Sequence, residues 1–142
     1  MENKRFKPML DKMFFIIWIP TVLLLIAATF ISSFEPVSLF IIIPTDVLTL
    51  YFLLTSLFGY VELRAECVFV KLGFFASREI PYEKIRGITK ERKLYADSMV
   101  SLKHSLEHVN IKYNRFDLVS VSVVENDELI SDLRKRIGQK EK

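Results

Sequence analysis

Three polar residues, His104, Glu107 and His108, have the spacing of the H-x-x-E-H pattern of inverted zinc proteases. In that pattern two histidines on one face of a helix hold zinc beside a glutamate that activates water. Alternating apolar residues instead predict a strand over Val109–Tyr113, directly after His108, so the required helix is not expected. The sequence therefore argues against a zinc metalloprotease.

The rest of the sequence contains no nucleophile with a neighbouring base, no phosphate-binding glycine loop and no cofactor fingerprint. The four glycines are isolated, at positions where junctions, corners or a helix end are expected. Cys67 is the only cysteine, so an intramolecular disulfide is impossible. We predict a protein that is not an enzyme, with no catalytic residue, no metal ligand and no cofactor.

Asp46 is the ionisable residue in the least expected place. It lies near the middle of the second of two apolar runs, residues 37–59, and residues 13–59 as a whole hold no Lys or Arg and only one other acid, Glu35. If this run crosses a membrane, a charge at that depth costs about 3 kcal/mol, so it needs a partner or water. We expect a polar contact with another helix, another subunit or a membrane-inserted ligand such as a peptide toxin. The alternative is local: Pro44 interrupts the helix, and Thr45 and Asp46 cap the segment that restarts.

A basic run is the other candidate binding feature, because each Lys or Arg near an anionic leaflet contributes about 1 kcal/mol. The run predicts contact with anionic lipid, but Glu83 and Glu91 interrupt it, and a solvated face of mixed charge is the alternative. The net charge of +3 is too diffuse for nucleic acid binding. The residues of the run are Lys84, Arg86, Lys90, Arg92 and Lys93.

Two long apolar runs must position Asp46. They cover residues 13–33 and 37–59, and a short polar loop with Pro36 at its exit separates them. About 20 helical residues cross a hydrocarbon core of roughly 30 Å, and a bilayer requires a helix because it offers no water to backbone groups. We predict a transmembrane hairpin. A cleaved signal peptide and a buried hairpin in a soluble protein are the alternatives.

Positive charges predict the orientation of this hairpin. Lys and Arg residues lie before the first run and after the second, whereas the connecting loop has only Glu35. The positive-inside rule then places residues 1–12 and the C-terminal part in the cytoplasm, with the protein in the cell membrane. The flanking basic residues are Lys4, Arg5, Lys7, Lys12, Arg64, Lys71 and Arg78.

Residues 60–142 change to the alternating pattern of strands. We expect about seven: 60–64, 67–72, a third containing Phe74, Phe75 and Ile80, then 85–93, 98–102, 109–113 and 118–124. The last segment instead has apolar residues at one-, three- and four-residue spacings, which predict one amphipathic helix. Asn126 or Asp127 is expected to cap its start and Gly138 to end it.

Seven short strands followed by one amphipathic helix is the element order of a pleckstrin-homology-like (PH-like) domain, a bent sheet whose open corner the helix closes. The chain resembles small YyaB-like bacterial proteins, which carry two transmembrane helices ahead of such a domain. It departs from them at Val123–Asn126, where Ser-Pro and a polar residue are usual. The resemblance rests on 59–63, 70–75, 80–85, 98–102, 109–113 and 121–123.

The resemblance implies an α+β membrane protein in which a transmembrane hairpin precedes a cytoplasmic PH-like domain of about seven antiparallel strands and a C-terminal helix. Related membrane-anchored proteins protect Gram-positive producers against their own bacteriocins. The implied function is a non-enzymatic binding module with the lipid bilayer and a membrane protein or peptide as partners, and immunity against a membrane-active peptide is its concrete version. The alternative is an accessory subunit of a transporter or envelope complex, with Asp46 binding a partner helix.

Overall fold

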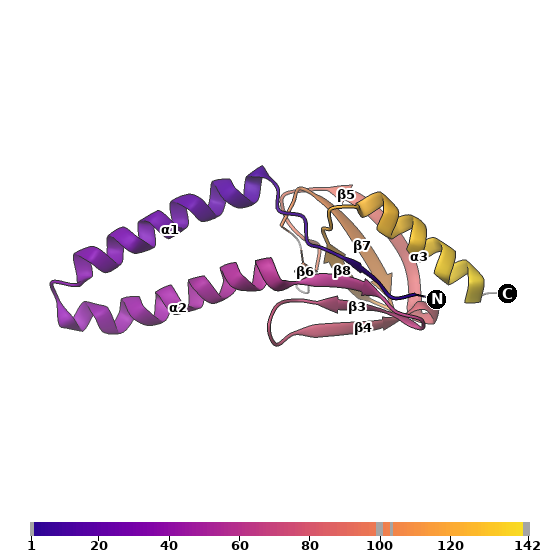
Figure 1. Ribbon diagram of the computed structural model, residues 1–142, viewed down its shortest axis with the longest axis horizontal. Helices are drawn as coiled ribbons and strands as arrows, with labels where there is room; N and C mark the ends of the chain where they lie inside the picture. Colours follow the sequence, from indigo (N-terminus) through magenta and orange to yellow (C-terminus); the bar gives the residue numbers. More distant parts are fainter. Residues whose placement is uncertain (1, 99–100, 103, 141–142) are drawn as a thin grey trace.

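The structure, a computed structural model, describes residues 2–98, 101–102 and 104–140. A hairpin of two long helices, α1 (Lys12–Ser32) and α2 (Pro36–Phe58), extends from a strand-rich domain (Figure 1). Each helix is long and apolar enough to cross a membrane. The expected order, two apolar helices followed by a strand-rich PH-like region and a C-terminal helix, is confirmed.

Local sequence explains where the two long helices begin and end. The Asp11 carboxylate accepts hydrogen bonds from the backbone N–H groups of Met13 and Phe14, which caps the start of α1. Pro36 occupies the first turn of α2, where a missing N–H is harmless. Gly59 ends α2 in an extended conformation that leads directly into a strand. A side chain there would collide with Leu102.

The first sheet combines a strand that precedes the helical hairpin with three strands that follow it. Its antiparallel strands are in the order β1-β2-β3-β4. The first strand, Lys4–Phe6, was not predicted, and it pairs with the strand that follows α2, with Lys4 opposite Leu63. The helices are therefore held to the domain at both ends. The four strands are β1 (Lys4–Phe6), β2 (Tyr60–Leu63), β3 (Cys67–Lys71) and β4 (Ser77–Pro81).

The second sheet follows a short 3-10 helix, η1 (Tyr82–Lys84), and has the order β5-β7-β8-β6. Its pairs are antiparallel except β6 with β8, which is parallel, so the expectation of an entirely antiparallel sheet is wrong there. Residues 99 and 100 of the strand expected over 98–102 lie outside the described residues. The strands are β5 (Ile85–Arg92), β6 (Ser101–Leu102), β7 (Glu107–Tyr113) and β8 (Asp117–Val121).

Phe74 and Phe75 lie outside the third strand that they were expected to begin. Gly73 has a φ of 120°, which turns the chain out of the sheet before Phe74. The strand β4 starts only at Ser77. The two aromatic side chains are consequently displayed on the β3–β4 loop, residues 72–76, instead of alternating across a sheet.

The C-terminal helix α3 (Asn126–Lys140) packs its apolar side on the sheets, and Leu129 and Leu133 are fully buried. The prediction that Gly138 ends this helix is wrong. Gly138 keeps a helical conformation, because a glycine at an exposed site costs a helix only about 1 kcal/mol. The core that α3 covers consists mainly of Phe6, Val61, Leu63, Val68, Val70, Ile80, Tyr82, Val109, Ile111, Val119, Val121 and Val123.

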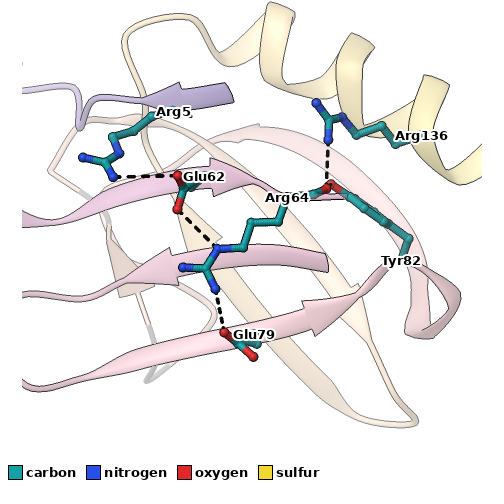
Figure 2. A network of polar contacts seen from close by, with 6 residues as sticks. All are labelled: Arg5, Glu62, Arg64, Glu79, Tyr82 and Arg136. Atoms are coloured by element: carbon teal, nitrogen blue, oxygen red, sulfur yellow. Dashed lines mark hydrogen bonds and ion pairs between the residues drawn. The ribbon is translucent and has the colours of Figure 1, made fainter. Parts of the chain in front are cut away.

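Polar contacts fasten this core at the C-terminal end of β2 (Figure 2), which points away from the long helices (Figure 1). The backbone carbonyl of Arg64 accepts hydrogen bonds from the Tyr82 hydroxyl and the Arg136 guanidinium, both at 2.8 Å. The Arg64 side chain donates to Glu79 at 2.8 Å and to Glu62 at 3.3 Å. Arg64, the residue that follows β2, thus connects η1, α3 and β4. Its positive charge is paired with Glu62 and Glu79.

Candidate functional site: the cleft between the long helices

The two long helices are close at their connecting loop and diverge toward the strand-rich domain (Figure 1). Between them lies a cleft of about 550 Å³, which we call the interhelical cleft. Its walls are mostly apolar, and its polar groups come from both helices. The lining residues are Val22, Leu25, Ile26, Thr29, Phe30, Ser33, Asp46, Thr49, Leu50 and Leu53.

Asp46 and Thr29 meet inside this cleft. The Thr29 hydroxyl lies 2.6 Å from Oδ2 of Asp46 and 2.9 Å from the carbonyl of Leu25. A hydroxyl has one proton, and we assign it to the carboxylate, which is nearer and the stronger acceptor. The other carboxylate oxygen, Oδ1, is buried and has no hydrogen-bond partner among the described residues. Asp46, which lines the cleft, therefore has one carboxylate oxygen that no described residue pairs.

The structure places the neighbours of Asp46 outside the cleft. Pro44 is exposed, and Thr45 donates only to the carbonyl of Ile41 within its own helix, at 2.9 Å. The helix α2 runs through Pro44 without restarting, so Thr45 and Asp46 do not cap a new segment. Of the three residues singled out in this region, Asp46 alone lines the cleft.

A second hollow, of about 630 Å³, joins the cleft at its domain end, and Thr49 lines both. His104 and Thr55 lie here, and the imidazole Nε2 and the threonine hydroxyl are buried without a hydrogen-bond partner among the described residues. Burial lowers the pKa of His104. Its ring meets the edge of Phe14 at 5.9 Å between centroids. Sequence reasoning did not foresee that this loop histidine faces α1, because only the fold brings them together.

The H-x-x-E-H residues do not share one helical face. His104 is in a loop, whereas Glu107 and His108 begin β7 and point to opposite sides of the sheet. His108 is fully buried, and Glu107 forms a 3.6 Å ion pair with Lys90. The geometry of an inverted zinc protease is therefore not present.

A different grouping has the spacing of metal ligands among the described residues: Glu91, Asp97 and His108. The ammonium of Lys93 already supplies the cation, because its nitrogen lies 2.8 Å from Glu91 and 3.2 Å from Asp97. The hydrogen bond to Glu91, followed by that to Asp97, raises the pKa of Lys93, and Lys93 in turn lowers the pKa of Asp97. The group is an ion-pair cluster in which one ammonium joins two carboxylates.

The basic run extends along the whole of β5 instead of forming one patch. Lys84 lies at the end nearest the β7–β8 turn, where its carbonyl accepts from Asn114, and Arg86 is two residues further. Arg92 and Lys93 are at the opposite end, where the backbone N–H of Lys93 donates to Leu106. Lys90, between them, donates to Asp127 at 2.9 Å.

Comparison with known families agrees with this architecture. The family profile of the bacterial PH domain matches residues 60–137, which include every strand after α2 and most of α3. The search of curated proteins gave no match, and the search of solved structures gave none either. PH-like domains are generally binding modules without catalytic activity. The matched region is more than half of the chain, and the chain belongs to the bacterial PH domain family.

Proposed function

We propose that this protein is a membrane-anchored, non-enzymatic binding module. In this proposal α1 and α2 span the membrane with both of their domain ends in the cytoplasm, and the interhelical cleft receives a helical segment of another membrane-embedded polypeptide. The observation that carries the proposal is that Asp46 lines a mostly apolar cleft while its Oδ1 has no hydrogen-bond partner among the described residues.

Exposure of the helices supports the placement in a membrane. Large apolar side chains point outward all around both helices, for example Leu24 at 70% exposure and Phe40 at 82%. A helix of a soluble domain would bury one apolar face and present a polar one. Surfaces that are apolar on every side suit hydrocarbon, and the basic residues before α1 and after α2 favour cytoplasmic ends.

The polar group in the cleft defines what kind of occupant fits. A lipid chain would fill the apolar walls but offers no hydrogen-bond donor, so Oδ1 of Asp46 would stay unpaired at a depth where that is costly. A helix fills the same walls with side chains and can present a hydroxyl, amide or ammonium to Asp46. A helical segment that carries one such donor is therefore the occupant we propose.

Photocrosslinking in native membranes tests this proposal. A benzoylphenylalanine replaces Leu50, which lines the cleft, or, as the matched control, Leu48, which is similarly exposed but does not line it. We expect a membrane polypeptide to be captured from position 50 and not from 48, and Asp46→Asn to reduce that capture several-fold. Equal capture from both positions, or capture unaffected by Asp46→Asn, would contradict the proposal.

Protection against a membrane-active peptide is the biological setting we propose for this binding. It rests on the resemblance to PH-like immunity proteins, with the cleft as the place where a helical peptide is held. Deleting the gene should sensitise the host to a specific peptide, and the intact gene, but not the Asp46→Asn form, should restore resistance. Unchanged sensitivity across a panel of such peptides, together with capture of a resident membrane protein, would instead indicate an accessory subunit.

A further inference from the structure

The β3–β4 loop lies along the side of α2. Gly73 packs so closely on Thr55 that a Cβ at this position would lie 2.2 Å from the threonine methyl. Phe74 and Phe75 continue the contact along the helix: the Phe74 ring is 5.2 Å from that of Phe58, and the Phe75 ring stacks on Tyr51 at 6.4 Å and 19°. The tip of the loop therefore lies beside the C-terminal part of α2 (Figure 1).

The contact with Tyr51 sets the depth of this loop. Tyr51 is seven residues before Phe58, about 10 Å along a helix, and helical side chains tilt further toward the N-terminus. The 23 residues of α2 only just exceed a hydrocarbon core of roughly 30 Å. If α2 spans the membrane, a ring stacked on Tyr51 lies below the headgroups of the inner leaflet.

A second apolar loop reaches the other long helix. Leu94 and Tyr95, on the β5–β6 loop, are 76% and 65% exposed. Leu94 lines a hollow with Ile17 and Trp18, which belong to the first two turns of α1. The backbone N–H of Lys93 donates to the carbonyl of Leu106, and the N–H of Leu106 donates to the Asp11 carboxylate at the start of α1. The β5–β6 loop is therefore held beside the first turns of α1.

We propose that the bacterial PH domain docks on its own membrane by inserting the β3–β4 loop, through Phe74 and Phe75, into the apolar part of the inner leaflet beside α2. Leu94 and Tyr95 form the second contact, beside α1. This docking rests on the membrane placement given under Proposed function, but not on any partner in the cleft.

Exposure and charge indicate lipid as the occupant of this surface. Phe75 is 89% exposed although it is stacked on a helix that is itself apolar on every side, so the medium that covers α2 also covers Phe75. Arg92 lies two residues before Leu94, at the level where headgroup phosphates would be, whereas the ammonium of Lys93 is paired with Glu91 and Asp97. Lys84 and Arg86 are at the far end of β5, so only part of the basic run can share in the docking.

Spin labels on the full-length chain test the depth of the loop. In a Cys67→Ser background, Phe75→Cys carries a nitroxide in bilayer discs of phosphatidylethanolamine and phosphatidylglycerol. Phe116→Cys is the matched control, because Phe116 is 86% exposed but on the β7–β8 turn at the far end of the domain. Val47→Cys, halfway along α2, is the reference for lipid. Accessibility to oxygen and to a water-soluble nickel chelate gives a depth parameter at each site.

We expect the label at position 75 to have a positive depth parameter, as at 47, and the label at 116 a negative one. Ala76→Cys, on the same loop, should agree with position 75 and replaces it if Phe75→Cys does not fold. A negative value at 75 with a positive value at 47 overturns the docking while membrane placement stands. Negative values at both overturn docking and placement together. A label at 75 shielded from both reagents reports a protein contact and also overturns the docking.

Discussion

Apolar side chains point outward along α1 and α2, whereas those of the strands and of α3 mostly point into the core of the domain. Leu24 in α1 is 70% exposed and Leu133 in α3 is not exposed at all, although both are leucines on helices. In the domain, water drives burial and a hydrophobic core results. Along the hairpin most large apolar side chains stay exposed in the described part of the chain, although a few, such as Tyr51 and Phe58, contact the β3–β4 loop. With the membrane placement proposed above, the comparison teaches that this one chain is folded for two solvents.

The region where these two parts meet follows neither pattern. Here Gly59 and Gly73 allow backbone to approach Leu102 and Thr55, and Asp11 joins the start of α1 to the β6–β7 loop. Such close contacts fix how the helices leave the domain. Variants in the core, at the junction and on the outward faces of the helices should therefore differ in a defined order.

The largest effect is expected in the core. Leu133→Ala should lower the free energy of unfolding of the domain by about 2–5 kcal/mol, because it removes buried methyl groups and leaves a cavity. Leu24→Ala, on the outward face of α1, should change it by no more than about 0.5 kcal/mol. Denaturant unfolding of the full-length protein in micelles, followed by circular dichroism, measures both. Similar losses for the two variants would show that the hairpin belongs to the same cooperative core.

An intermediate effect is expected where the domain touches α2. Gly73→Ala forces an unfavourable φ of 120° and a collision with Thr55, which should destabilise the protein by about 1–3 kcal/mol. Gly87→Ala is the matched control, because a Cβ there meets nothing within 4 Å. Hydrogen exchange of residues 72–76 should rise in the first variant only. Unchanged exchange in Gly73→Ala would mean that the loop does not depend on this contact.

The sequence was sufficient to predict the elements that have a long, regular pattern of apolar residues. The long apolar runs predicted both long helices, and the one-, three- and four-residue spacing predicted α3, because each pattern extends over several turns. The features that the sequence did not predict are either very short or depend on the backbone conformation of a single residue. Nothing in Lys4–Phe6 distinguishes three residues of strand, since its partner β2 lies beyond the whole hairpin. Phe74 and Phe75 have strand propensity, but the backbone conformation at Gly73 directs them elsewhere.

The sequence pointed to only one of the two residues that form a hydrogen bond between the long helices. A carboxylate within an apolar run requires compensation, so Asp46 could be selected from composition alone. Its partner Thr29 could not, because the pairing depends on the stagger and crossing of two helices, which uniform apolar composition does not encode. His104 was noticed for a zinc pattern that its loop conformation rules out, while its position facing α1 has no sequence signal.

A smaller effect than at Leu133 or Gly73 is expected at Asp11, which holds the start of α1 to the domain. Although partial burial opposes it, hydrogen bonds from Leu106, Ser105, Phe14 and Met13 lower the pKa of this carboxyl. A lowered pKa in the folded state contributes stability that is present above the ordinary carboxyl range near pH 4 and is lost as the pH falls below it. Asp11→Ala should therefore lower the free energy of unfolding by about 1 kcal/mol at pH 7 and by less at pH 3.

Glu35→Ala is the control, since Glu35 precedes α2 without a side-chain capping bond. Denaturant unfolding at the two pH values measures the difference, and a loss at Asp11 that does not shrink with acid would mean that its ionised form is not what holds the junction together.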